Sequence, residues 1–87
     1  MTKEQALEKF FDDIGWNATE QSRITGKSRQ TLWLWFAKGQ PRGAYKKTFD
    51  EALDGIETWL EANYLSWYRE GGHDLYERVA ELREMNQ

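Results

Sequence analysis

Residues 18–36, ATEQSRITGKSRQTLWLWF, decide the fold of this chain. Gly26 divides them into two helical segments, because glycine readily adopts the positive φ that turns a chain sharply. Ser28 can then cap the second segment by accepting a hydrogen bond from a free backbone N–H. Leu32 and Trp35 stand three residues apart, so they share a helix face that can be buried. Two helices joined by a short glycine-containing turn are the pattern of a helix-turn-helix.

Helix signals continue on both sides of this stretch. Gly15 and Gly39 follow apolar segments, as is usual where a helix ends. Gly55 falls inside the fourth segment and lowers its helix propensity by about 1 kcal/mol. Three residue pairs have the spacing of a capping box, namely Thr2 with Gln5, Asn17 with Glu20, and Thr48 with Glu51. The sequence therefore predicts helices over residues 3–14, 18–25, 29–38, 49–70 and 74–85.

The whole chain is expected to be all-α. Its 87 residues allow one modest core, and no segment shows a strand-like alternation of apolar and polar residues. Aromatic residues make up 15% of the chain and include five Trp, so they should supply much of that core. We predict a compact helical bundle of about five helices, with a helix-turn-helix domain over 1–69 and a C-terminal helical extension over 70–87.

The net charge of −3 conceals a strong asymmetry along the chain. Residues 23–47 hold seven Lys and Arg residues and no acid, whereas the segments 1–22 and 48–87 are both acidic. A basic block of this kind is either a solvated loop region or a surface for a polyanion. Its coincidence with the helix-turn-helix pattern favours the second interpretation, with double-stranded DNA as the partner.

The recognition helix is expected over residues 28–37, and side chains suited to reading bases lie at its start. In helix-turn-helix proteins this end of the second helix enters the major groove. Arg can read guanine and Gln can read adenine through paired hydrogen bonds. The lysines just before the fourth helix would instead meet the DNA backbone. The expected DNA-binding residues are Arg23, Lys27, Ser28, Arg29, Gln30, Thr31, Trp33, Lys38, Arg42, Lys46 and Lys47.

The stretch TGKSRQTLWLW, followed by WFAKGQPRG, resembles the Cro and phage-repressor type of helix-turn-helix domain. The likeness rests on a Gly, a Ser and an apolar residue at this spacing, and then on Trp35, Gly39 and Pro41. It covers roughly residues 2–60. The resemblance implies a compact helical DNA-binding domain, usually dimeric, that acts as a transcriptional regulator in a bacterium or phage.

The sequence departs from that family's pattern at two pairs of positions. Gln21 and Lys27 stand where the family often has apolar residues, which weakens the expected packing of the second helix. Trp33 and Leu34 stand where exposed base-reading side chains are usual. These two apolar groups could touch thymine methyls, serve a protein partner, or indicate a different helix register.

A homodimer is expected, because one recognition helix reads only a few base pairs. The helices after residue 50 are the expected contact. The seam formed by Leu75, Val79 and Leu82 fits either packing within the chain or a two-helix dimer seam. We favour self-association, since a short helix after a glycine pair needs something to pack on. The expected dimer interface is Trp59, Trp67, Leu75, Val79 and Leu82.

Two hypotheses of function remain open. The first is a sequence-specific, double-stranded DNA-binding transcriptional regulator, such as a small phage or bacterial repressor. The second is a protein-interaction module that binds a host or partner protein through Trp33 and Leu34. Binding to duplex DNA that depends on salt would separate the two.

An enzyme is not expected from these residues. His73, the only histidine, stands beside a glycine pair, and there is no Cys and no glycine-rich phosphate loop. Neither a cofactor nor a metal is expected. No signal region and no apolar run of about 18 residues is present, so we expect a cytoplasmic protein with no membrane partner.

Overall fold

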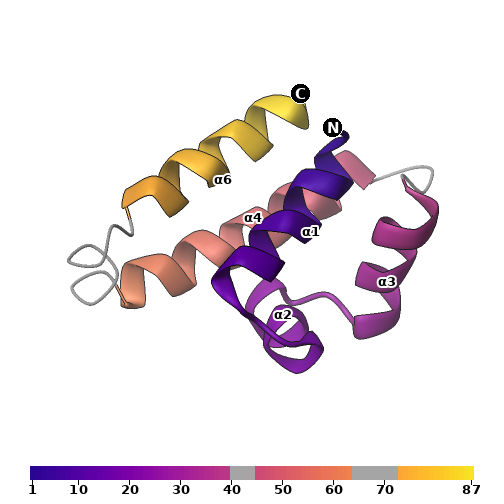
Figure 1. Cartoon of the computed structure of the whole chain (residues 1–87), viewed down its shortest axis with the longest axis horizontal. Coiled ribbons are helices and arrows are strands. Elements are labelled where there is room, and N and C mark those ends of the chain that lie inside the picture. The colour runs from indigo at the N-terminus through magenta and orange to yellow at the C-terminus, as the bar shows by residue number, and fades with distance from the viewer. Residues whose placement is uncertain (40–44, 64–72) are drawn as a thin grey trace.

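The computed structural model describes residues 1–39, 45–63 and 73–87, and this part of the chain contains five helices and no strand. The helices form one bundle (Figure 1), in which α1, α3, α4 and α6 supply the buried apolar residues of a common core and α2 packs against α4 and α3. The predicted all-α bundle of about five helices is confirmed. The helices are α1 (Lys3–Ile14), α2 (Ala18–Thr25), α3 (Arg29–Lys38), α4 (Tyr45–Ala62) and α6 (His73–Met85).

The first three helices begin and end where the sequence predicts. Thr2 and Asn17 each form a complete capping box, and the Ser28 hydroxyl accepts a hydrogen bond from the Thr31 backbone N–H at 3.1 Å. Gly15 and Gly26 end α1 and α2 in the left-handed conformation, with φ of 82° and 72°. These signals act over three or four residues, so they can be read without knowledge of the tertiary structure.

The fourth helix begins earlier than predicted. α4 starts at Tyr45 rather than after a cap at Thr48, and the Thr48 hydroxyl donates a 2.9 Å hydrogen bond to the Tyr45 carbonyl inside the first turn. The earlier start follows from burial, because Tyr45 is itself a core residue at 2% exposure. The predicted extension of this helix to residue 70 falls partly outside the described residues, as does Trp67.

Aromatic side chains build much of the core, as the composition predicts. Trp35, Tyr45 and Phe49 form one cluster, with ring centroids 5.2–5.8 Å apart. Trp16 packs edge-on against Trp59 at 5.0 Å and against the phenylalanines of α1. Because rings of this size bury a large area, three short helices and two longer ones are enough to enclose a core.

The last helix belongs to the same core and is not a separate extension. α6 packs against α1 and α4, and its Val79 and Leu82 are only 1% and 3% exposed within the single chain. Of the two alternatives that the sequence left open for this seam, Val79 and Leu82 show packing within the chain, since α1 and α4 cover them, and homodimerisation itself stays a prediction. Leu75 and Trp59 are half-buried against the same core. The proposed division at residue 70 likewise cuts through one packed unit.

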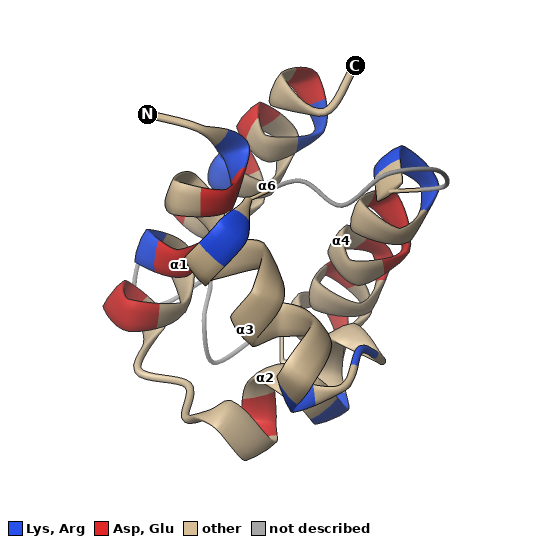
Figure 2. Ribbon diagram, turned by 90° about the vertical axis from the view of Figure 1, so that its right-hand side faces the viewer, with Lys and Arg blue, Asp and Glu red and all other residues tan. Residues whose placement is uncertain are grey.

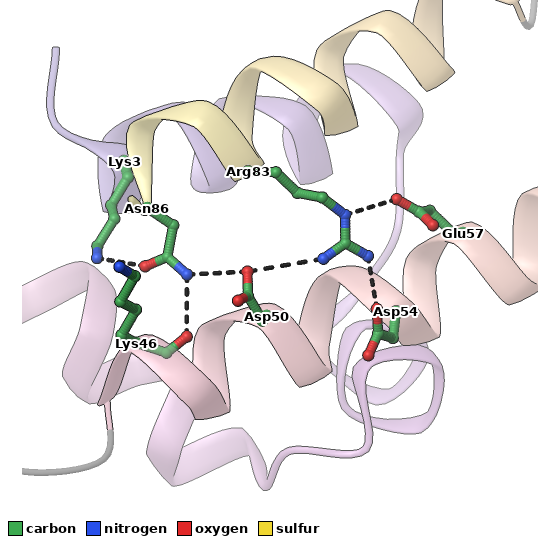
Figure 3. A network of polar contacts seen from close by, with 7 residues as sticks. All are labelled: Lys3, Lys46, Asp50, Asp54, Glu57, Arg83 and Asn86. Carbon is green, nitrogen blue, oxygen red and sulfur yellow. Dashed lines mark hydrogen bonds and ion pairs between the residues drawn. The ribbon is translucent and has the colours of Figure 1, made fainter.

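A polar network holds the end of α6 against α4 (Figure 3). Arg83 binds three α4 carboxylates, at 3.6 Å to Asp50, 2.5 Å to Asp54 and 2.8 Å to Glu57. The hydrogen bond to Glu57 is the main cause that raises the pKa of Arg83 above its usual value. Asn86 donates to the Lys46 carbonyl at 2.9 Å and accepts from the Lys3 ammonium. One end of the bundle is thus tied together across α1, α4 and α6.

Gly55 has a structural role that its sequence position does not reveal. α4 runs unbroken through this glycine, and the end of α2 lies directly against it. A Cβ at this position would clash with the Ile24 carbonyl oxygen and lie 3.2 Å from the Thr25 Cα. The absence of a side chain therefore lets α2 and α4 approach closely, and this contact fixes α2 on the core.

Candidate nucleic-acid interface

The turn between α2 and α3 is locked by its own polar groups. The Gly26 N–H donates to the Ser22 carbonyl at 3.0 Å, and the Ser22 hydroxyl donates to the Lys27 carbonyl at 2.7 Å. The Thr25 hydroxyl accepts a 3.2 Å hydrogen bond from the Lys27 N–H. The Ser22 side chain therefore helps to hold the turn through its hydroxyl. α3 is therefore placed by a rigid connection of three residues.

Polar residues take the place of apolar packing on α2. The Gln21 side-chain amide donates to the Trp16 carbonyl at 2.9 Å, and the Gln21 backbone carbonyl accepts from the buried Thr25 hydroxyl at 2.7 Å. Buried polar groups stabilise a fold when their hydrogen bonds are made, and these are made. The departure from the family pattern at Gln21 is thus compensated within this chain.

Lys27 is directed toward α4 and not toward open solvent. Its ammonium lies 3.1 Å from the Glu51 carboxylate, and the Lys27 side chain is only 19% exposed. The ion pair joins the turn to the first half of α4. The sequence predicts that Lys27 binds DNA, but this ion pair occupies its charge within the chain, so we remove it from the candidate interface.

The register of α3 is the one that the sequence predicts. Leu32 and Trp35 are 2% and 1% exposed, so one face of α3 is fully buried. Arg29 and Gln30 are exposed on the first turn. The Arg29 guanidinium donates to the Thr19 hydroxyl of α2, which steadies it at the edge of the exposed face. Two side chains that can hydrogen-bond base edges therefore stand at the free N-terminal end of α3.

Ser28 and Thr31 have local roles that compete with DNA contact. The Ser28 hydroxyl caps α3 and also donates to the Thr31 hydroxyl at 2.8 Å. Thr31 is half-buried. The sequence predicts that both residues bind DNA. Their position at the start of α3 keeps them beside the candidate interface, but their hydrogen bonds serve the helix end first.

The remaining predicted cations surround α3 without lying along its middle. Arg29 and Lys38 are the first and last residues of α3, and no charged residue lies between them. Arg23 on α2 and Lys46 and Lys47 on the first turn of α4 are exposed. Figure 2 shows the blue of Lys and Arg at the two ends of α3 and on the first turn of α4, with the middle of α3 uncharged. Arg42 lies outside the described residues.

The middle of the exposed α3 face is apolar. Trp33 is 60% exposed and Leu34 is 37% exposed, so both project from the bundle. A shallow hollow of about 140 Å³ lies beside Trp33, between α2 and α3. Its lining residues are Ala18, Gln21, Arg29, Leu32, Trp33 and Phe36.

Four acidic side chains of α4 have basic partners within the chain. Asp50, Asp54 and Glu57 converge on Arg83 of α6 (Figure 3), and Glu51 pairs with Lys27. Exposed charges closer than about 8 Å act on one another at physiological salt. The acids of α4 are therefore partly neutralised by internal partners, and this reduces their effect on a polyanion at α3.

Comparisons with family models, with curated proteins and with solved structures give no significant match to this chain. In the part of the chain that the structure describes, no helix is long and apolar enough to cross a membrane.

Proposed function

We propose that this chain is a sequence-specific, double-stranded DNA-binding transcriptional regulator of the Cro and phage-repressor type. The first turn of α3 enters the major groove in this proposal. The observation that supports it best is the exposure of Arg29 and Gln30 on that turn, above a face anchored by Leu32 and Trp35. A rigid helix that presents Arg and Gln at its N-terminal end has the chemistry needed to read base edges.

The exposed cations around α3 supply the sequence-independent part of the binding. Arg23, Lys38, Lys46 and Lys47 are free to meet phosphates on either side of the groove, with Arg42 as a further candidate in the connection. Phosphate contacts set the position of a protein on DNA, whereas base contacts specify the sequence. The two groups of residues therefore have separable roles.

We propose further that the chain binds as a homodimer, because two recognition helices one DNA turn apart would double the site. Since Val79 and Leu82 are internal, any contact between copies must use other surfaces. The protein would then prefer an inverted repeat.

A second candidate function is favoured by the exposure of Trp33. An exposed Trp at the centre of a helix face is the kind of anchor that protein interfaces use. The chain would then be an interaction module that binds a host or partner protein through Trp33 and Leu34. Trp33→Ala would then abolish capture of that partner and leave the fold and any binding to duplex DNA unchanged.

Selection from random duplex DNA tests the first proposal, and variants then test the roles. If three to five cations of each subunit engage, a dimer neutralises about six to ten phosphates and loses about 10³–10⁵ in affinity between 50 and 200 mM salt. Arg29→Ala or Gln30→Ala should cost about 1–3 kcal/mol on the selected site and relax the preference at one or two base pairs.

The lysines of α4 provide the contrast. Lys46→Ala or Lys47→Ala should weaken binding to all duplexes alike and reduce the salt slope by about one for each phosphate that is no longer neutralised. Lys9→Ala is the matched control, because Lys9 is exposed on α1 and pairs with Asp13 at 3.3 Å. It should change neither property. Binding that is independent of salt would overturn this assignment. So would a base preference that changes in the lysine variants and stays the same in the Arg29 and Gln30 variants.

A further inference from the structure

The exposed face of α3 consists of two parallel rows, each polar at its start and apolar one turn later. Side chains four residues apart lie above one another on a helix. Trp33 therefore follows Arg29 in one row, and Leu34 follows Gln30 in the other. All four are exposed, and no acidic residue stands among them. A partner of α3 therefore contacts two polar side chains at the N-terminal end of the helix and two apolar side chains one turn further along.

The apolar pair has little capacity for hydrogen bonding. Leu34 has no polar side-chain atom, and the Trp33 indole has one N–H donor and no acceptor. Exposed large apolar groups that gather on one face usually mark a binding site. The basic residues at both ends of α3, Arg29 and Lys38, favour a polyanionic partner over an apolar one. The partner must therefore offer an apolar group within a strongly negative surface.

Duplex DNA offers one such group. The C5-methyl of thymine is the apolar feature that the four bases display in the major groove, and apolar side chains read it by contact. Four helical residues span about 6 Å, and successive base pairs are about 3.4 Å apart. A methyl contacted by Trp33 or Leu34 therefore lies within about two base pairs of the base that Arg29 or Gln30 reads.

We infer that Trp33 and Leu34 recognise thymine through its C5-methyl group, within two base pairs of the bases contacted by Arg29 and Gln30. The inference rests on the proposed DNA binding and adds which base the apolar half of the helix selects. It predicts that the selected site carries thymine at this distance in each half-site.

Replacement of each thymine of the selected site by deoxyuridine tests this directly. The substitution removes the methyl and preserves the O4 acceptor and the base pairing. Removal of one buried methyl should weaken binding about fourfold. Deoxyuridine at positions outside the selected site should not change the affinity. In the Trp33→Ala or Leu34→Ala variant, the effect of deoxyuridine at the contacted thymine should disappear, whereas Gln30→Ala should retain it.

Trp33→Gln is the second variant, since it keeps a long side chain and replaces the apolar ring by an amide. Circular dichroism and melting confirm that each variant is folded, as expected for a residue that is 60% exposed.

A selected site that has no thymine within two base pairs of the bases contacted by Arg29 and Gln30 overturns the inference. The inference also fails if deoxyuridine at these thymines does not weaken binding. It fails likewise if deoxyuridine still weakens binding in both the Trp33 and the Leu34 variants. In these three cases duplex binding itself survives. A chain that binds no duplex overturns the proposed function together with the inference.

Discussion

Gly55→Ala should destabilise this protein although alanine is the better helix former. In an exposed helix interior the substitution would stabilise the protein by about 1 kcal/mol. Here the added Cβ would clash with the backbone carbonyl of Ile24, which no rotamer change can relieve. Overpacking a core costs about 1–3 kcal/mol, and a backbone clash should lie at the top of that range. The net destabilisation should therefore be about 2 kcal/mol.

Thermal melting followed by circular dichroism measures the effect. For a domain of this size, 2 kcal/mol lowers Tm by about 8–16 °C. The matched control is Thr58→Ala, one turn further along α4 on its exposed side, where the substitution removes only the hydrogen bond to the Asp54 carbonyl. That variant should remain within about 0.5 kcal/mol of the parent. A Gly55→Ala protein that melts at or above the parent's Tm would show that α2 and α4 are not in the close contact described.

Two further predictions concern contacts that join distant parts of the chain. The Tyr45 hydroxyl donates to the buried Glu4 carboxylate at 2.7 Å, and burial together with this bond raises the pKa of Tyr45. A phenol whose pKa is higher in the folded state contributes stability that is complete below about pH 10 and is lost at higher pH. Tyr45→Phe should therefore lower the free energy of unfolding by about 1–3 kcal/mol at pH 7. In urea titrations, the stability of this variant should decrease less than that of the parent between pH 9 and 11. An equal decrease in both proteins would contradict the pairing. Arg83→Met should cost about 1–2 kcal/mol at low salt, since it breaks three partly exposed ion pairs, and less in 1 M NaCl. Lys9→Met, which breaks one exposed pair, is its near-neutral control, and an Arg83 effect that does not change with salt would refute an electrostatic role.

Local signals in the sequence were sufficient for much of the fold. A cap and its partner are three residues apart, so Thr2, Asn17 and Ser28 mark the starts of α1, α2 and α3 without reference to anything distant. The three-residue spacing of Leu32 and Trp35 was likewise enough to orient α3. The same register placed Trp33 and Leu34 on the exposed side, so the candidate reading face could be predicted from the sequence.

Long-range contacts decided what the local signals could not. The sequence predicts that Lys27 meets phosphate, and only the position of α4 shows that Glu51 takes its charge. Val79 and Leu82 form an apolar seam that fits a dimer equally well until α1 and α4 are seen to cover it. An apolar stripe specifies that a face will be buried, but it does not specify which surface will bury it.

The start of α4 and the presence of glycine at residue 55 are both explained by tertiary contacts. Helix propensity argues against a glycine at residue 55, and the capping pattern argues for a start at Thr48. The tertiary structure overrides both, because Tyr45 gains a place in the core and α2 gains a close approach to α4. The sequence by itself determined where most helices begin, through bonds between neighbours in the chain. The tertiary structure alone decided which faces meet and which charges remain free, because those depend on atoms brought together from opposite ends of the chain.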